Sequence, residues 1–330
     1  MTEKTNNPFN EWIRLEQPRL GTEVLYATDD FFAPKERLID PADPVWIEDK
    51  YDDNGKWMDG WESRRKRVEG YDYCIVKLGI PGVIHGFDID TSFFTGNYAP
   101  AASIDVCVSE EQLPGDDADW RELMPKADLD GDSHNYCPVN SETAVTHLRL
   151  NIYPDGGVAR LKIYGEVRPQ PSQYSSGESI DLLSMQNGGR ALLASDEHYG
   201  SMHNLNLPDQ GTHMGDGWET ARRRGPGCDW VVFELGRPGT IEKVCIDTSF
   251  YKGNFPDRAE VRAAMVTTID NLAENSAGWP VLLPECKLEM DSILEYVDEL
   301  QDLGVISHVR LNSIPDGGVM RLRMIGKADD

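Results

Sequence analysis

Two short basic runs are the groups with which this chain could bind a small anion. Arg65 and Arg67 follow a D-G-W-E sequence in the first half of the chain, and Arg222 and Arg224 follow a second one in the other half. A planar guanidinium can hold a carboxylate through two parallel hydrogen bonds, which lysine cannot do. The runs therefore predict a carboxylate-binding site. An exposed basic loop or a salt bridge between subunits would give the same pattern.

The glutamate of each D-G-W-E sequence is a candidate acid–base group. Glu62 and Glu219 stand three residues before the first of these arginines, so each could act as a general base or pair with an arginine. A structural ion pair is the simpler alternative, because the neighbouring Trp61 and Trp218 are typical core residues.

A histidine, an arginine and an asparagine alternate with apolar residues near the end of each half. Successive side chains of a strand point to opposite faces, so the three polar residues share one face. Histidine is the natural proton carrier near neutral pH. This face either lines a site or is the solvated outside of a sheet. The residues are His147, Arg149 and Asn151 in the first half and His308, Arg310 and Asn312 in the second.

These candidates occur twice because the chain is an internal duplication. The segment that begins at Asp59 aligns without a gap to the one that begins at Asp216, with D-G-W-E, L-G-x-P-G, I-D-T-S-F and G-N in common. Near the ends, H-[LV]-R-L-N-x-x-P-D-G-G also recurs. A linker rich in Pro, Ser and Gln is predicted over residues 168–179, between domains at about 10–168 and 178–328.

The apolar pattern predicts an all-β fold. Tyr73–Leu78 and Trp230–Leu235 read as strands closed by Gly-x-Pro-Gly turns, with further strands after them. Pro154–Gly157 predicts a hairpin. Only residues 293–303 have a helical pattern. Many short strands separated by Gly and Pro indicate antiparallel sandwiches.

Composition excludes several classes of function. A formal net charge of −25 over 330 residues repels nucleic acid and anionic membrane, so neither is an expected partner. No apolar stretch is long enough to span a bilayer and no signal sequence is recognisable, which predicts a cytoplasmic protein. The six cysteines contain no C-x-x-C pair, and the D-L-D-G-D run at 128–132 departs from the EF-hand pattern. No metal site and no cofactor are predicted.

Taken together, the repeated motifs resemble the allantoicase family over nearly the whole chain. Those that carry the resemblance are D-G-W-E-[ST]-x-R-[RK]-R, I-D-T-S-F-[FY]-x-G-N-[YF], W-x-x-L-[ML]-P and H-[LV]-R-L-N-x-x-P-D-G-G. The resemblance implies two tandem galactose-binding-like jelly-roll domains. It also implies hydrolysis of allantoate to ureidoglycolate and urea in purine degradation, by a homo-oligomer that is often a hexamer.

The chemistry of allantoate gives the candidate residues their roles. The substrate is a carboxylate whose neighbouring carbon carries two ureido groups, so a general acid could protonate the departing ureido nitrogen and a general base could deliver water. A metal-activated water is the alternative route. Asp90 and Asp247, each in an Asp-Thr-Ser run after a strand, could accept hydrogen bonds from a ureido group or cap their own backbone.

Two other classes of function fit a duplicated sandwich. A tandem ligand-binding module without catalysis is the main alternative, since sandwiches of this kind often bind sugars. A structural oligomerisation protein would not need paired arginines and histidines in both copies.

Overall fold

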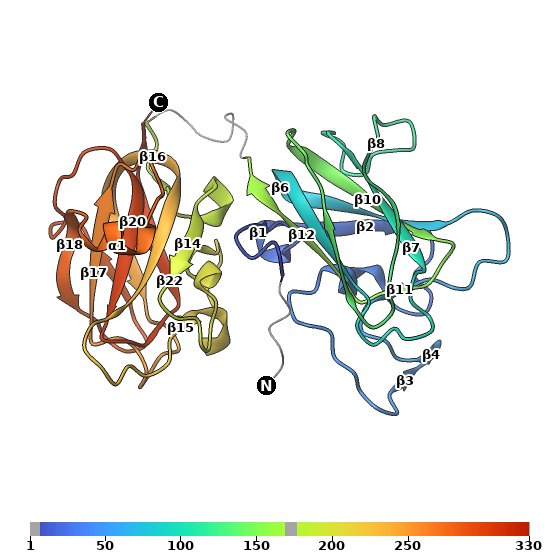
Figure 1. Cartoon of the computed structure of the whole chain (residues 1–330), viewed down its shortest axis with the longest axis horizontal. Helices are drawn as coiled ribbons and strands as arrows, with labels where there is room; N and C mark the ends of the chain where they lie inside the picture. Colours follow the sequence, from blue (N-terminus) through green and yellow to red (C-terminus); the bar gives the residue numbers. More distant parts are fainter. Residues whose placement is uncertain (1–6, 169–176, 330) are drawn as a thin grey trace. The chain divides into compact units, whose positions relative to one another are not determined.

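The computed structural model describes residues 7–168 and 177–329. The chain divides after Arg168 into two compact units, each built almost wholly of strands (Figure 1). The predicted linker falls mostly on residues 169–176, outside the described residues. Both units are jelly-roll sandwiches, which confirms the predicted fold class.

Unit one contains two main sheets and a few short elements. Its strands are β1 (Ile13–Arg14), β2 (Glu23–Ala27), β3 (Tyr51–Asp52), β4 (Gly55–Lys56), β5 (Trp61–Glu62), β6 (Asp72–Asp90), β7 (Ala101–Cys107), β8 (Arg121–Asp128), β9 (His134–Pro138), β10 (Val145–Tyr153), β11 (Gly157–Val158) and β12 (Arg160–Val167). Its 3-10 helices are η1 (Pro18–Leu20) and η2 (Lys35–Ile39).

Unit two, as described over residues 177–329, repeats the order of the main strands without a counterpart of the β3–β4 pair, and it has two helices that correspond to none in unit one. Its strands are β13 (Ile180–Asp181), β14 (Arg190–Ala194), β15 (Trp218–Glu219), β16 (Asp229–Asp247), β17 (Arg258–Ala264), β18 (Val281–Lys287), β19 (Ile293–Tyr296), β20 (Ile306–Ile314), β21 (Gly318–Val319) and β22 (Arg321–Ala328). Its helices are η4 (Met185–Asn187), η5 (Met202–Asn206) and the two without a counterpart, η6 (Met214–Asp216) and α1 (Leu272–Ala277).

One long strand in each unit belongs to both sheets of its sandwich. The first part of β6 pairs with β2 and β10, and β7 and β8 extend that sheet; the second part pairs with β12 and β9. In unit two, β16 pairs first with β14 and β20 and then with β22 and β19. The sandwich is therefore closed by a strand that passes from one sheet into the other.

The Gly-x-Pro-Gly sequences lie inside these long strands, so the predicted turns are wrong. At Gly79 an added Cβ would collide with the carbonyl oxygen of Leu20, and at Gly236 with that of Asn187. These glycines admit a neighbouring backbone segment where the strand leaves one sheet for the other.

The hairpin predicted around Pro154–Gly157 is also wrong. Strands β10 and β12 on either side of it both pair with β6 and not with each other. Gly157 and Val158 instead pair with β5, opposite Glu62 and Trp61. The P-D-G-G sequence thus carries the chain between the sheets and holds the D-G-W-E segment in place.

Residues 293–303 do not form the predicted helix. Residues 293–296 are β19, whose side chains alternate between exposed and buried as a strand requires, and it pairs with β16. The single α-helix of the described residues is α1, at Leu272–Ala277.

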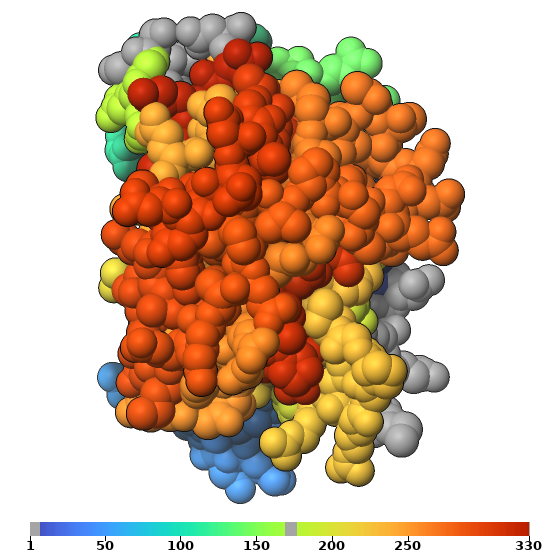
Figure 2. Space-filling model, turned by 90° about the vertical axis from the view of Figure 1, so that its left-hand side faces the viewer, coloured from blue at the N-terminus to red at the C-terminus, as the bar shows by residue number. Residues whose placement is uncertain are grey.

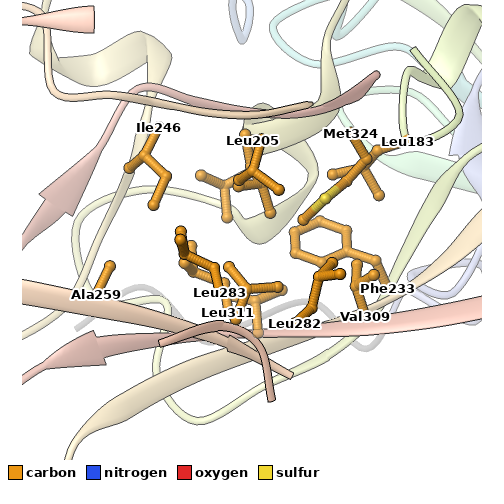
Figure 3. Packing of buried hydrophobic residues seen from close by; sticks show 14 of the residues in the cluster. Leu183, Leu205, Phe233, Ile246, Ala259, Leu282, Leu283, Val309, Leu311 and Met324 are labelled. Carbon is orange, nitrogen blue, oxygen red and sulfur yellow. The ribbon is translucent and has the colours of Figure 1, made fainter. Parts of the chain in front are cut away.

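Both cores are formed by the inward side chains of the two sheets. Figure 3 shows Phe233, Val309 and Leu311 facing Leu205 and Ile246 in unit two. Trp61 and Trp218 are fully buried, as the D-G-W-E pattern predicted.

Candidate functional site

The four candidate arginines are free cations on loops. Arg65, Arg67, Arg222 and Arg224 are exposed, and among residues 7–168 and 177–329 none of them forms an ion pair or a side-chain hydrogen bond. In a chain of net charge −25, such unpaired guanidinium groups are places where a small anion can bind.

The basic residues next to them in sequence are held by ion pairs with aspartates. Arg64 pairs with Asp29 at 2.6 Å, and Lys66 pairs with Asp72 at 2.6 Å. In unit two Arg223, the counterpart of Lys66, pairs with Asp229 at 2.5 Å. The loop is thus anchored through alternate residues, and this leaves the candidate arginines pointing to solvent.

Glu62 and Glu219 are bound by asparagines, not by arginines. Asn97 donates a hydrogen bond of 2.8 Å to Glu62, and Asn254 one of 2.5 Å to Glu219. These amides belong to the G-N motif, so the contact joins two repeated motifs. Burial raises the pKa of the Glu62 carboxyl, although the bond from Asn97 opposes that shift. A raised pKa suits a carboxyl that must exchange a proton near neutral pH.

His147 and His308 lie within the sheet face, not on a solvated one. Nδ1 of His147 is 2.8 Å from the hydroxyl of Thr146, and Nδ1 of His308 is 2.9 Å from that of Ser307. In both rings Nε2 is buried without a hydrogen-bond partner. Burial lowers the pKa of both imidazoles, so both are neutral near pH 7.

The arginine that follows has different partners in the two units. In unit one Arg149 pairs with Asp105 at 3.0 Å, and its guanidinium carbon lies 5.4 Å and 5.0 Å from the ring centres of Tyr73 and Trp120. Asn151 donates to the same aspartate at 2.9 Å. The guanidinium of Arg149 is therefore already paired with a carboxylate of the protein, that of Asp105.

In unit two the equivalent arginine is covered by α1. Arg310 donates to the carbonyl oxygen of Ala273 at 3.0 Å, to the hydroxyl of Ser276 at 2.8 Å and to the amide oxygen of Asn312 at 2.8 Å. The guanidinium carbon of Arg310 also lies 4.4 Å from the centre of the Trp230 ring. In Figure 2 orange atoms from this part of the chain project at the right of the face.

Asp90 and Asp247 are buried at the ends of β6 and β16 and cap their own backbone. Their Oδ1 atoms accept hydrogen bonds from the backbone N–H of Ser92 at 2.8 Å and of Ser249 at 2.7 Å. Oδ2 of Asp90 has no hydrogen-bond partner, so one acceptor of this carboxylate remains unused.

Two arginines that the sequence analysis did not single out are the most deeply buried cations of this region. Arg160 donates to Asp59 at 3.0 Å and to the backbone carbonyl of Ala42 at 2.9 Å. Arg321 does the same with Asp209 in unit two. Each is the first residue of a strand with the sequence R-L-x-x-x-G, at residues 160–165 and 321–326. The recurrence of this sequence in both halves is the signal that could have identified the two arginines. Their saturated hydrogen bonding makes them structural.

The described part of the chain shows no group of three or more His, Cys, Asp and Glu side chains arranged to hold a metal ion. All six cysteines are free thiols. No helix in residues 7–168 and 177–329 is long and apolar enough to cross a membrane.

The repeated fold with polar clusters at corresponding places in both units defines a duplicated jelly-roll protein with candidate sites for a small polar anion. A family model described as the allantoicase repeat matches residues 13–168 and again 180–329. The chain belongs to the allantoicase family.

Curated relatives and solved structures support this membership over the full length. A probable allantoicase of Photobacterium profundum is 53% identical over 320 residues, 96% of this chain and 97% of its own length. One of Pseudomonas syringae pv. syringae is 51% identical over 322 residues, 97% of each chain. The crystal structure of allantoicase from Saccharomyces cerevisiae is 36% identical, covers 95% of this chain and 92% of its own, and gives a TM-score of 0.80.

Proposed function

We propose that this protein is an allantoicase, which hydrolyses allantoate to ureidoglycolate and urea in purine degradation. The family membership and the full-length similarity to proteins named allantoicase support the activity. The structural observation that carries it is the set of unpaired, exposed arginines placed identically in both units of a very acidic chain. Together these favour an enzyme over a tandem sugar-binding module or an oligomerisation protein.

In this proposal the arginine loops hold the substrate carboxylate. Arg65 or Arg222 binds it through two hydrogen bonds, and Arg67 or Arg224 adds positive charge beside it. Glu62, held by Asn97, is a candidate to exchange a proton with a ureido nitrogen, since its burial favours the protonated form. The reaction needs no cofactor if side chains supply both acid and base.

We further propose a cytoplasmic homo-oligomer without nucleic-acid or membrane partners. The net charge of −25 supports the last point, because it opposes binding to phosphate-rich surfaces. Sedimentation or light scattering of the purified protein would measure the mass, and a monomer at working concentration would contradict the oligomer.

The experiment that tests the activity is urea release from allantoate by the purified protein, with and without a chelator. An enzymatic rate that the chelator leaves unchanged supports hydrolysis by side chains alone. Loss of the rate on chelation would move the search to a metal site. No urea under any metal supplementation would overturn the assignment and favour a ligand-binding module.

Alanine substitutions then test the arginine loops. Arg65→Ala and Arg222→Ala should each raise KM if its loop binds the carboxylate, and the unit that carries the site will show the larger effect. Arg237→Ala is the matched control, because Arg237 is also an exposed arginine but lies within the glycine-rich part of β16. A KM unchanged in both loop variants would contradict the proposed role of the loops.

A further inference from the structure

A cluster that exists in unit one alone lies on the sheet formed by the second part of β6. Asp88 and Asp90 are two residues apart on β6 and therefore face the same side, and His134 on β9 pairs with Asp90 across the sheet. Nδ1 of His134 is 2.8 Å from Oδ2 of Asp88 and 3.8 Å from Oδ2 of Asp90. The structure thus places one imidazole against two carboxylates.

These carboxylates have acceptor capacity that the protein does not use. Asp88 and Asp90 are 1% and 0% exposed, yet Oδ1 of Asp88 and Oδ2 of Asp90 have no hydrogen-bond partner. Buried polar atoms are normally paired, and an ionised oxygen is the most costly to leave unpaired. The unmet need is for hydrogen-bond donors.

The chemistry of the cluster identifies the kind of ligand that would meet this need. Two carboxylates repel an anion, and the described residues show no set of ligands for a metal ion here. A neutral group that carries several N–H donors fits best, and a ureido group is such a donor. Lys162, 3.9 Å from Oδ2 of Asp88, offsets part of the negative charge.

Unit two has lost the cluster. Cys245 stands where unit one has Asp88, and the residue that pairs with Asp247 is Ile293, where unit one has His134. The duplicated strand therefore keeps one aspartate but neither of its two partners. Any function of the cluster of Asp88, Asp90 and His134 therefore belongs to unit one.

We propose that Asp88 and Asp90 bind a ureido group of the substrate and that His134 is the general acid that protonates the departing nitrogen. This inference rests on the proposed allantoicase activity. His134 is partly exposed, at 29% of its side chain, so its Nε2 can be reached while Nδ1 stays on Asp88.

With allantoate as substrate, urea leaves first and water adds second. His134 gives its Nε2 proton to one ureido nitrogen, the C–N bond breaks with its electron pair going to that nitrogen, and urea leaves. The lone pair of the other ureido nitrogen forms a C=N bond. Water then adds its oxygen to the carbon, the π electrons return to nitrogen, and the water's proton goes to Nε2. The products are urea and ureidoglycolate, and the imidazolium is regenerated.

The charges around His134 suit this role. The hydrogen bond that His134 donates to Asp88 has the largest influence and raises the pKa of the imidazole; the charge of Asp90 raises it further, and burial and Lys162 oppose the shift. Tyr136 stacks on the ring at 5.9 Å on the same strand. The imidazolium therefore persists to a higher pH than an isolated histidine would allow.

The test compares His134→Gln with His85→Gln in the full-length protein. His85 is the matched control, because it lies on the second part of β6, the strand that pairs with β9, and like His134 it contacts a carboxylate, with Nε2 3.0 Å from Glu166. His134→Gln should lower kcat by about 100-fold or more with KM little changed, as expected for loss of a general acid. His85→Gln should keep the wild-type kcat.

Asp88→Asn separates a proton-transfer role from a structural one. Without the Asp88 charge, the pKa of His134 falls, so the descending alkaline limb of the kcat profile should move to lower pH. Thermal unfolding checks that each variant is folded. Undiminished kcat in a folded His134→Gln variant, or an unmoved alkaline limb in folded Asp88→Asn, would overturn the inference. Absence of urea release by the wild type would instead reject the proposed function itself.

Discussion

The ionisation of the Glu62 carboxyl should affect the stability of unit one. Burial raises its pKa, so between the unfolded and folded pKa values the folded state binds more protons, and stability falls as pH rises through this window. Glu62→Gln removes the charge and can still accept the Asn97 hydrogen bond. We expect its Tm to exceed the wild-type Tm at pH 7 and to match it near pH 4. Equal differences at both pH values would contradict this account.

The sequence pointed to some of the candidate residues and not to others, and the difference depends on whether a residue recurs in both copies. Repetition between the copies drew attention to the arginines and to Glu62, because both copies carry them. Repetition gives no signal for His134, because the position that corresponds to it in unit two holds Ile293. The spacing F-D-I-D at the end of a predicted strand could have shown two carboxylates on one face. The roles of the predicted site residues stay predictions.

Among the elements, the passage of β6 between the sheets depends on Gly79. Gly79→Ala places a methyl group against the backbone of Leu20, which cannot move aside as a flexible side chain could. We expect a loss of about 1–3 kcal/mol in the free energy of unfolding, the range for overpacked sites. Denaturant titration measures it. Gly96→Ala is the control, because its added Cβ would meet nothing within 4 Å; similar losses in both would count against the contact.

Helix α1 depends on its contact with Arg310. Ser276 is fully buried and its hydroxyl accepts from the guanidinium at 2.8 Å. Ser276→Ala leaves that buried donor short of a partner, and we expect a loss of about 1–3 kcal/mol in unfolding free energy. Ala277→Ser, at the exposed next position, should change the midpoint of denaturation little. A neutral Ser276→Ala would mean that Arg310 finds another acceptor.

Strands were predicted well where apolar and polar side chains alternate. The prediction was poor where the sequence had to distinguish a turn from a passage of the chain between two sheets. Alternation showed the strands and the duplication. The Gly-x-Pro-Gly and P-D-G-G sequences looked like turns because turns and passages between sheets both need glycine. Which one occurs depends on the backbone segments that approach, such as residue 20 at Gly79, and these lie far away in sequence. Residues 293–303 show the limit of short apolar patterns, for which helix and strand are hard to separate.

At the scale of the molecule, each unit has its own core and should unfold with its own stability. Leu150 and Leu311 are fully buried counterparts in β10 and β20. Leu150→Ala and Leu311→Ala should each cost about 2–5 kcal/mol in the affected unit. Differential scanning calorimetry should show one transition shifted by the first variant and the other by the second. A single transition moved equally by both would show that the units unfold together.

The strand common to both sheets also determines how a sandwich can open. A sheet with strands of its own could detach while the other persisted, but neither sheet of unit one can separate without pulling on the same covalent segment, β6. Backbone amides on the two sides of the core should therefore exchange their hydrogens with solvent through one shared opening event. Such a unit would have no partly unfolded state in which one sheet of the sandwich is lost and the other remains. The polar clusters on its surface would therefore keep their geometry until the whole unit unfolds.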